Sequence, residues 1–262
     1  MSDRKKLLSE QAIDNVRRWF DENGRGTAVI GISGGKDSAV VAGLCVRALG
    51  KDRVVGVLMP DGTQADIEDS RKVVSELGIR HLEANVGEAC KAMRSCIGKA
   101  FQEWSGTGAF GPVQGVSPAA MINVPPRERM TALYTIAQTI SELNGEHAAV
   151  IGTGNKAESM VGYCTKGGDD KSDMDPIGDY WVSEVLRIGD ELGYYPDIIH
   201  KAPADGLCGR TDEDRLGFGY DQVEMAFTGR EAELPPEILE KILRMHRLSE
   251  HKRRPVEVFR RA

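Results

Sequence analysis

The chain has 262 residues, of which 40% are hydrophobic and 28% charged, and this composition is typical of a globular protein rather than of a disordered or fibrous one. Its net charge of −6 excludes a global basic face for duplex nucleic acid. No apolar run approaches the roughly 20 residues that span a bilayer, and the N-terminal segment lacks the apolar core of a signal peptide. We therefore expect a cytoplasmic protein with neither nucleic acid nor a membrane as partner.

The cysteines point to the same compartment. They form no CxxC pair and are odd in number, namely Cys45, Cys90, Cys96, Cys164 and Cys208. In a chain of this length such cysteines indicate reduced thiols in a reducing environment.

Helical and strand patterns alternate along the chain. After an amphipathic N-terminal helix, apolar runs predict strands at 28–32, 53–59, 80–84 and 148–153. Helical spacing predicts helices at 38–49, 67–78, 86–101 and 127–143, whereas the Gly- and Pro-rich residues 104–126 indicate a long irregular connection. Strands with few polar residues predict an α/β fold: a doubly wound, Rossmann-like parallel sheet covered by helices on both faces. We see no repeat or linker and expect one domain over residues 1–262.

The bend between the first strand and its helix is unusually polar, because it reads SGGKDS at 33–38. Gly34 and Gly35 allow successive N–H groups to point into one concavity, and the following helix directs its free amides at the same point. Ser33 and Ser38 add hydroxyl donors. The simpler interpretation is an ordinary helix start after a glycine turn.

Two charged residues in the bend favour a nucleotide site over that simpler interpretation. Lys36 adds a cation. Asp37 is compatible with a bound anion if Mg²⁺ lies between the carboxylate and the phosphate oxygens. The stretch is not a Walker A motif, since GxxxxGK[ST] is absent. It matches SGGxDS, the pyrophosphate loop of the ATP pyrophosphatase (adenine nucleotide α-hydrolase-like) superfamily, whose members cleave ATP between the α- and β-phosphates.

Other motifs narrow the resemblance. Residues 150–179, VIGTGNKAESMVGYCTKGGDDKSDMDPIGD, resemble the signature of the NAD synthetase family. So do INVPPRERM at 122–130, LMPDGTQ at 58–64, GLCGRTDEDRLGFGYDQVE at 206–224 and the basic HKRR near the C-terminus. The resemblance extends from about residue 10 to the end. It implies that deamido-NAD, ATP and ammonia give NAD, AMP and pyrophosphate through an adenylated nicotinate carboxylate.

The resemblance also implies roles for individual residues. It implies that Asp37 and Glu158 are the Mg²⁺ carboxylates. It implies that Asp169 and Lys166 are the catalytic residues beside the nicotinate and ammonia. The implied ATP and pyrophosphate residues are Ser33, Gly34, Gly35, Lys36, Asp37, Ser38, Gln64, Thr153 and Thr165. The implied deamido-NAD residues are Arg127, Arg129, Lys166, Asp169, Lys252 and Arg253, and Thr211 and Asp212 belong to a segment that lines the site.

Plainer interpretations remain beside these. Taken alone, Glu158 is better explained as a solvated glutamate in a first helical turn, and only its place within GTGNKAE favours the metal site. Lys252 and Arg253 are also compatible with a frayed basic tail. Residues 167–175 predict either a mobile lid or a plain solvated loop.

The sequence departs from the family pattern at two places. Val182 stands where several family members have a lysine that stabilises phosphate charge, and we expect Lys36 to supply part of that charge. Pro203 and Ala204 stand where small polar residues are frequent.

The source of ammonia and the assembly follow from the resemblance. Glutamine-dependent members carry an amide-hydrolysing domain with a Glu-Lys-Cys set, whereas only 32 residues precede the loop here and none is a cysteine. We therefore expect the ammonia-dependent form without a glutaminase domain, and a homodimer with the deamido-NAD site at the interface.

Two other functions stay open. Another ATP pyrophosphatase could adenylate a different acceptor, although the reactive cysteine pair of thiolating enzymes and the basic surface of tRNA-modifying enzymes are not visible. A non-enzymatic adenine-nucleotide sensor could keep the glycine loop, but it has no evident use for Asp37, Glu158 and Asp169 together.

Overall fold

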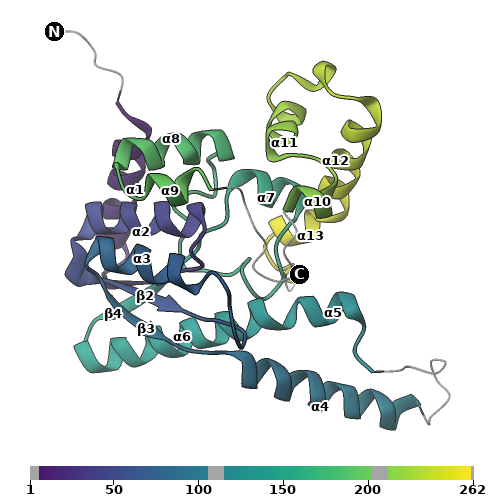
Figure 1. The fold of residues 1–262 in the computed structure, drawn as a ribbon, viewed down its shortest axis with the longest axis horizontal. Coiled ribbons are helices and arrows are strands. Elements are labelled where there is room, and N and C mark those ends of the chain that lie inside the picture. Colours follow the sequence, from purple (N-terminus) through teal and green to yellow (C-terminus); the bar gives the residue numbers. More distant parts are fainter. Residues whose placement is uncertain (1–5, 106–114, 202–211, 261–262) are drawn as a thin grey trace.

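The computed structural model describes residues 6–105, 115–201 and 212–260. Within them, a four-stranded parallel sheet has the order β3-β2-β1-β4 (Figure 1). The strands are β1 (Arg25–Gly31), β2 (Val54–Leu58), β3 (Arg80–Glu83) and β4 (His147–Ile151). The chain runs outward from β1 to β3 and then returns to add β4 on the other side of β1. The strand order therefore reverses between β1 and β4, which is where ligands bind in open α/β sheets.

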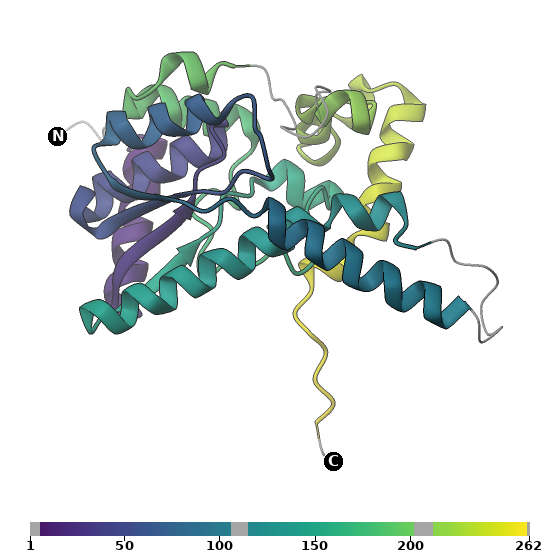
Figure 2. The ribbon, with the colours of Figure 1, turned by 60° about the horizontal axis from the view of Figure 1, so that its bottom comes forward.

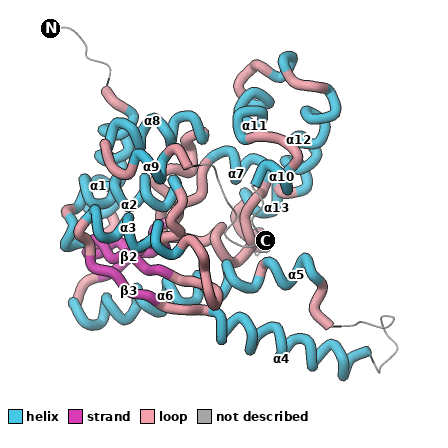
Figure 3. The backbone as a smooth tube through the Cα atoms, viewed as in Figure 1, coloured by secondary structure: helices cyan, strands magenta, loops and turns pink. Residues whose placement is uncertain are grey.

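Helices cover both faces of the sheet (Figure 3). One face packs against α1 (Leu8–Glu22), α2 (Lys36–Leu49), α3 (Ile67–Leu77), α8 (Val182–Leu192) and α9 (Pro196–Ile199). The other face packs against α4 (Gly87–Ser105) and α6 (Val124–Asn144), and the short α5 (Pro118–Ile122) lies between them in the chain. This arrangement confirms the predicted α/β class with helices on both faces.

Strand β1 shows how a continuous apolar run serves two cores. Ala28 and Ile30 point into the core beneath α1 and α2, whereas Val29 between them points into the core beneath α4 and α6. Successive side chains of a strand leave opposite faces of the sheet. A strand that is buried on both faces therefore needs apolar residues at every position, as this one has.

A third core lies beside the sheet (Figure 1). It is formed by α7 (Lys156–Val161), α10 (Asp212–Leu216), α11 (Tyr220–Phe227) and α12 (Pro236–Leu248), and α13 (Glu250–Arg253) follows α12. Two short 3₁₀ helices, Lys51–Arg53 and Glu231–Glu233, complete the elements of the described ranges. Residues 254–260 contain no helix or strand and extend away from the body (Figure 2).

The predicted strands and helices up to residue 153 are confirmed, but the predicted irregular connection at 104–126 is wrong for its last part. Residues 118–122 form α5, and α6 begins at Val124 rather than at 127. The hydroxyl of Ser117 accepts a hydrogen bond from the amide of Ala120 (3.2 Å) and caps α5. Prolines 118 and 125 occupy first turns, where their missing N–H groups cost nothing. The prolines of this segment therefore mark the starts of two helices and not a loop.

Among the described helices, none combines the length with the apolar composition that crossing a bilayer requires.

Candidate active site

The loop after β1 depends on a glycine that no other residue can replace. Gly34 has φ +82°, which L-residues rarely adopt. A Cβ at this position would lie 2.9 Å from Cβ of Asp69 and 3.0 Å from the amide nitrogen of Ser70. The loop therefore lies directly against the start of α3, and the Gly35 amide at the start of α2 donates to the Ser33 hydroxyl (3.3 Å).

The two serines of the loop have different positions. The hydroxyl of Ser38 donates to the carbonyl of Gly35 (3.0 Å) and lies 3.1 Å from the hydroxyl of Ser33, and Ser38 is only 2% exposed. Ser38 therefore holds the loop in shape. Ser33 is exposed and lines the cavity above the loop.

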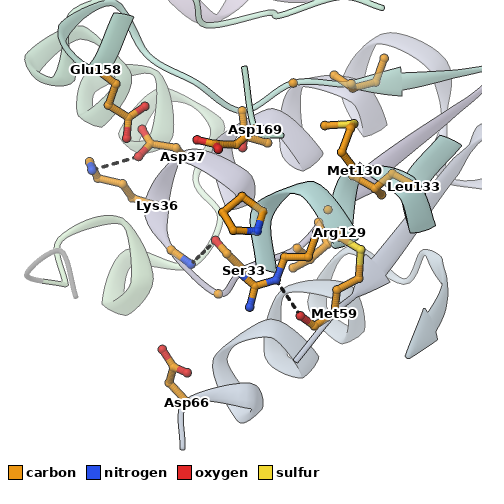
Figure 4. Close-up of a pocket in the computed structure, with 18 of the residues that line it drawn as sticks. Ser33, Lys36, Asp37, Met59, Asp66, Arg129, Met130, Leu133, Glu158 and Asp169 are labelled. Carbon is orange, nitrogen blue, oxygen red and sulfur yellow. Dashed lines mark hydrogen bonds and ion pairs between the residues drawn. The ribbon is translucent and has the colours of Figure 1, made fainter. Parts of the chain in front are cut away.

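A cavity of about 400 Å³ opens over the carboxyl ends of the strands. Its lining includes most of the residues predicted for the nucleotide site, namely Ser33, Gly34, Gly35, Lys36, Asp37, Gln64, Arg129, Thr153, Glu158 and Asp169. Figure 4 shows that Asp37, Glu158 and Asp169 gather at one end, whereas Met59, Met130 and Leu133 form an apolar end. Three carboxylates thus lie at one end of the cavity and apolar side chains at the other (Figure 4), an arrangement that suits a ligand with a phosphate chain and aromatic rings.

Glu158 enters the cavity from α7, whose first turn is held by a reciprocal cap. The side-chain oxygen of Asn155 accepts from the Glu158 amide (3.1 Å), and Oε2 of Glu158 accepts from the Asn155 amide (2.9 Å). Burial and the neighbouring Asp37 charge raise the pKa of Glu158 well above its usual value, although the hydrogen bond from the Asn155 amide and the charge of Lys36 oppose this. A carboxyl group with a strongly raised pKa in a cleft indicates a functional site.

Lys36 and Asp37 form an ion pair inside the cavity. Nζ of Lys36 lies 3.0 Å from Oδ2 of Asp37, and the two side chains are 9% and 18% exposed. Oδ1 of Asp37 is buried and accepts no hydrogen bond from the described part of the chain. One oxygen of this carboxylate is therefore available to a ligand.

Asp169 is positioned by Thr165. The amide of Thr165 donates to Oδ1 of Asp169 (2.8 Å), and the Thr165 hydroxyl donates to Oδ1 of Asn123 (2.7 Å). Thr165 is 7% exposed and does not line the cavity. Burial raises the pKa of Asp169, although the Thr165 hydrogen bonds oppose this. The threonine thus fixes the carboxylate that faces the cavity.

The predicted basic residues separate into two groups. Arg129 lies in the cavity, where its Nε donates to the carbonyl of Met59 (2.9 Å). Arg127 is exposed and donates to the carbonyl of Lys166 (3.1 Å), and Nζ of Lys166 lies 3.3 Å from the carbonyl of His251. Arg127 and Lys166 do not line the cavity within the described residues.

Lys252 and Arg253 bind the end of α7. Nζ of Lys252 donates to the carbonyls of Gly162 (2.7 Å) and Cys164 (2.5 Å). The guanidinium of Arg253 donates to the carbonyl of Ser159 (2.9 Å) and to others nearby. These contacts satisfy carbonyls that a helix leaves unpaired at its C-terminus. A frayed tail is therefore wrong for these two residues, which also line a second cavity of about 320 Å³ behind the loop.

Asp212 lines the first cavity and is held from behind by two tyrosines. The hydroxyls of Tyr163 and Tyr220 each lie 3.1 Å from one of its carboxylate oxygens. Other residues of this segment that the sequence singled out, namely Pro203, Ala204, Cys208 and Thr211, lie outside the described residues.

Part of the predicted lid is fixed to the sheet. The amide of Gly152 donates to the carbonyl of Met174 (2.8 Å), and the amide of Asp173 donates to the carbonyl of Val150 (2.9 Å). Met174 and Ile151 form a parallel bridge. Residues 173 and 174 therefore continue the sheet beyond β4 and are not a plain solvated loop.

Several cavity residues were not singled out as site residues by the sequence, among them the polar residues Asn155, Lys201 and Asp175. Asn155 is 1% exposed, and its Nδ2 has no hydrogen-bond partner within the described ranges. Lys201 pairs with Asp69 at 2.5 Å and reaches the rim. Asp175 lines the second cavity, where desolvation, and to a smaller extent the charge of Asp37, raise its pKa to about 7. Asn155 and Asp175 both lie within the quoted stretch at 150–179, whereas Lys201 had no signal in the sequence.

The donor set fits Mg²⁺ only in combination with phosphates. Over the described ranges, no three His, Cys, Asp or Glu side chains are grouped so that they could hold a metal by themselves. Mg²⁺ in nucleotide sites is typically bound by one or two carboxylates together with phosphate oxygens and water. The free Oδ1 of Asp37 beside Glu158 matches that pattern.

The raised pKa of Asp175 predicts that the protein without metal or nucleotide loses stability as pH rises. A carboxyl with a higher pKa when folded binds more protons in the folded state, so its contribution is lost between the ordinary pKa of 3.8 and the folded value of about 7. We expect urea midpoints measured in EDTA to fall over that range, and to fall less for Asp175→Asn. Parallel pH profiles for the two proteins would contradict this.

Comparisons with known proteins agree with this geometry. The model of the family described as NAD synthase matches residues 8–256. The NH(3)-dependent NAD(+) synthetase of Pyrococcus furiosus is 32% identical, over 95% of this chain and 94% of its own length. That of Archaeoglobus fulgidus is 35% identical, over 96% and 95%. The solved NMN synthetase of Francisella tularensis superposes with a TM-score of 0.78 at 28% identity, over 97% of this chain and 99% of that one. The resemblance seen in the sequence is confirmed, and the chain belongs to the NAD synthase family.

Proposed function

We propose that this protein joins ammonia to the nicotinate carboxyl group of deamido-NAD and cleaves ATP to AMP and pyrophosphate. The observation that carries the proposal is the convergence of Asp37, Glu158 and Asp169 in one cavity above the glycine loop, in a chain of the NAD synthase family. An oxygen of the nicotinate carboxylate attacks the α-phosphorus, and pyrophosphate leaves. Ammonia then attacks the acyl carbon, a proton is lost and AMP leaves.

The chain's contribution to this reaction is alignment and electrostatics. The amides around Gly34 and Gly35 and the N-terminus of α2 bind the pyrophosphate part of ATP. The apolar end of the cavity, lined by Met59, Met130 and Leu133, excludes water from the acyl adenylate, which water would otherwise hydrolyse. Asp169, held by Thr165, faces the carboxyl carbon and accepts a hydrogen bond from the incoming ammonia.

Mg²⁺ belongs to this proposal as the partner of ATP. Asp37 and Glu158 would hold it, because Asp37 offers a buried oxygen without a hydrogen bond and Glu158 lies beside it. When bound, the ion neutralises the charge that develops on the pyrophosphate leaving group.

The remaining basic residues are proposed to contact deamido-NAD. Arg129 does so from within the cavity. Arg127 and Lys166 point outside it, which is compatible with a nucleotide that reaches the surface where a second subunit docks. For Lys252 and Arg253 we propose an indirect role, because their donors already bind carbonyls at the end of α7.

A homodimer is part of the proposal, and exposed apolar residues on α4 and α5 form its interface. Met93 and Ile97 lie one turn apart on α4 and are 42% and 38% exposed, and Met121 and Ile122 on α5 are 40% and 48% exposed. The two helices lie side by side in both views (Figures 1 and 2), and Arg94 reaches the carbonyl of Met121 (3.5 Å). Exposed apolar residues on neighbouring helices are typical of interaction sites.

Replacing Met121 and Ile122 together by Asp is expected to raise the dimer dissociation constant at least about tenfold, since truncation of central apolar contacts has effects of this size. Sedimentation velocity at several concentrations measures it. The control is Leu143→Asp, at the other end of α6, where the side chain is 80% exposed. A wild-type monomer with full activity would contradict the proposed assembly.

A second acceptor has one observation in its favour. The NMN synthetase of Francisella tularensis covers nearly the same length with a TM-score of 0.78. Its name indicates that it forms nicotinamide mononucleotide, so nicotinate mononucleotide is the corresponding acid. The two acceptors share the nicotinate carboxyl group and the same chemistry, and they differ in the adenylate half.

The experiment that tests the proposal is product formation by the purified protein with ATP and Mg²⁺. Deamido-NAD or nicotinate mononucleotide is supplied as acceptor, with ammonium or glutamine as nitrogen donor. We expect NAD from deamido-NAD and ammonium, with one AMP and one pyrophosphate per NAD, and no product from glutamine. If only nicotinate mononucleotide gives product, it replaces deamido-NAD as the proposed acceptor. If AMP forms only with an unrelated acceptor, the proposed function is overturned.

We propose the cytoplasm as the place of the reaction.

A further inference from the structure

Lys36 is a cation placed among acids in the cavity. Its side chain is 9% exposed, and its Nζ lies 3.0 Å from Oδ2 of Asp37. Burial lowers the pKa of Lys36, but the charges of Asp37, Glu158 and Asp212 more than offset this, so the net shift is upward. The ammonium group is therefore held in place by carboxylates and not by solvent.

These carboxylates need a positive charge even without a ligand. Glu158 points toward Asp37 in Figure 4, and the second oxygen of Asp37 is buried without a hydrogen bond from the described residues. Two carboxylates that face each other in a cavity repel each other unless a cation or a proton intervenes. In the ligand-free protein, the group that meets this need at Asp37 is the ammonium of Lys36.

We propose that Lys36 is an exchangeable counterion, which neutralises Asp37 beside Glu158 in the empty site and thereby keeps a divalent cation out until ATP brings one. This inference rests on the proposed function, since it takes the cavity as the site of ATP and Mg²⁺. A divalent cation that enters alone meets an ammonium group 3.0 Å from the carboxylate it needs. ATP removes that obstacle, because its phosphates attract the ammonium group while they carry the metal.

The choice of lysine suits this exchange. An ammonium group on a flexible four-carbon stem can leave one anion for another, whereas a guanidinium would hold a carboxylate with two parallel hydrogen bonds. Lys36 is also the second residue after Gly34, in the loop that is expected to bind the pyrophosphate. Asp37 and the phosphates are thus both within reach of one side chain.

The test measures the binding of Mn²⁺ without ATP, by the loss of the electron paramagnetic resonance signal of the free ion. We expect Lys36→Met to bind Mn²⁺ at least about tenfold more tightly than wild type. The reason is that a like charge within a few ångström changes the equilibrium constant for binding or losing a cation by about a factor of ten or more. Lys36→Arg should stay as weak as wild type. The matched control is Lys72→Met, which removes a lysine that also lies 3.0 Å from an aspartate, but on the surface.

With ATP present, we expect wild type rather than Lys36→Met to bind Mn²⁺ more tightly. Lys36→Met is expected to bind the Mn²⁺–ATP complex more weakly than wild type and to raise the KM for ATP, since the phosphates lose a cation. Adding Asp37→Asn to Lys36→Met should abolish the gain in Mn²⁺ affinity, which places the gain at this site. Equal or weaker Mn²⁺ binding by Lys36→Met in the absence of ATP overturns the inference.

Thermal unfolding keeps the test decisive if Lys36→Met is unstable. Without metal, the variant should unfold at a lower temperature than wild type, because the carboxylates lose their counterion. Mn²⁺ should then raise the unfolding temperature of the variant by more than it raises that of wild type. A folded variant that gains no extra stability from Mn²⁺ also overturns the inference. If instead wild type fails to bind Mn²⁺–ATP, or Asp37→Asn binds it unchanged, the proposed function itself fails.

Discussion

Replacing Asp37 by Ala is expected to lower kcat by about 10²-fold or more, the scale at which enzymes lose a preorganised electrostatic partner. The substitution removes the carboxylate whose free oxygen faces the cavity, and it leaves Lys36 without its ion pair. Pyrophosphate release with saturating ATP, deamido-NAD and ammonium measures the effect.

The control for this prediction is Asp197→Ala. Asp197 also accepts an ion pair from a lysine at 3.0 Å, but its side chain is 80% exposed. We expect it to leave kcat within about twofold, as surface ion pairs contribute little. A loss smaller than tenfold for Asp37→Ala would exclude Asp37 from the proposed metal site.

The second large effect concerns Gly162, which ends α7. A Cβ at this position would lie 2.0 Å from Cβ of Ser249, and φ is +67°. We expect Gly162→Ala to lower the free energy of unfolding by roughly 2–5 kcal/mol, from left-handed strain together with overpacking. Activity should fall as well, because the overlap forces α12 and α13 away from the helix that carries Glu158.

Gly145 separates the two causes. It ends α6 with φ +68°, nearly the same angle, but nothing lies within 4 Å of its Cβ position. Gly145→Ala should therefore cost only the strain, about 1–2 kcal/mol. Ser249→Gly should recover the steric part in a double-mutant cycle with Gly162→Ala. Equal losses for Gly145→Ala and Gly162→Ala in urea unfolding would mean that the contact with Ser249 carries no energy.

The sheet and the loop could be predicted because their signals are local. The run at 28–32 is apolar at every position, and a strand buried on both faces requires this. The glycines and charges of the bend follow it directly, so Gly34 and Asp37 were found without knowledge of the fold. The strand β4 was predictable for the same reason, since its residues 148–151 are apolar and buried.

The third core was not predicted. Its helices α7 and α10 have only six and five residues, which is too short for a clear helical periodicity. The 13-residue α12 does carry apolar residues at helical spacing, namely Ile238, Ile242 and Met245, so this signal was missed. The contacts of Lys252 and Arg253 with α7 join residues about 90 positions apart, which no local pattern records. Asp175 likewise becomes part of the site only through the pairing of Met174 with Ile151. These residues reach the site through tertiary packing alone.

The support that Arg253 gives to α7 also sets the order in which the site matures during synthesis. The glycine loop is complete when the ribosome has made fewer than 40 residues, but Arg253 binds the carbonyl of Ser159 across 94 positions of sequence. A nascent chain that stops before α12 therefore presents the loop without the helices that brace Glu158. We therefore expect the site to be completed only after the last helices have been made, and an unfinished chain to lack the contacts that brace Glu158.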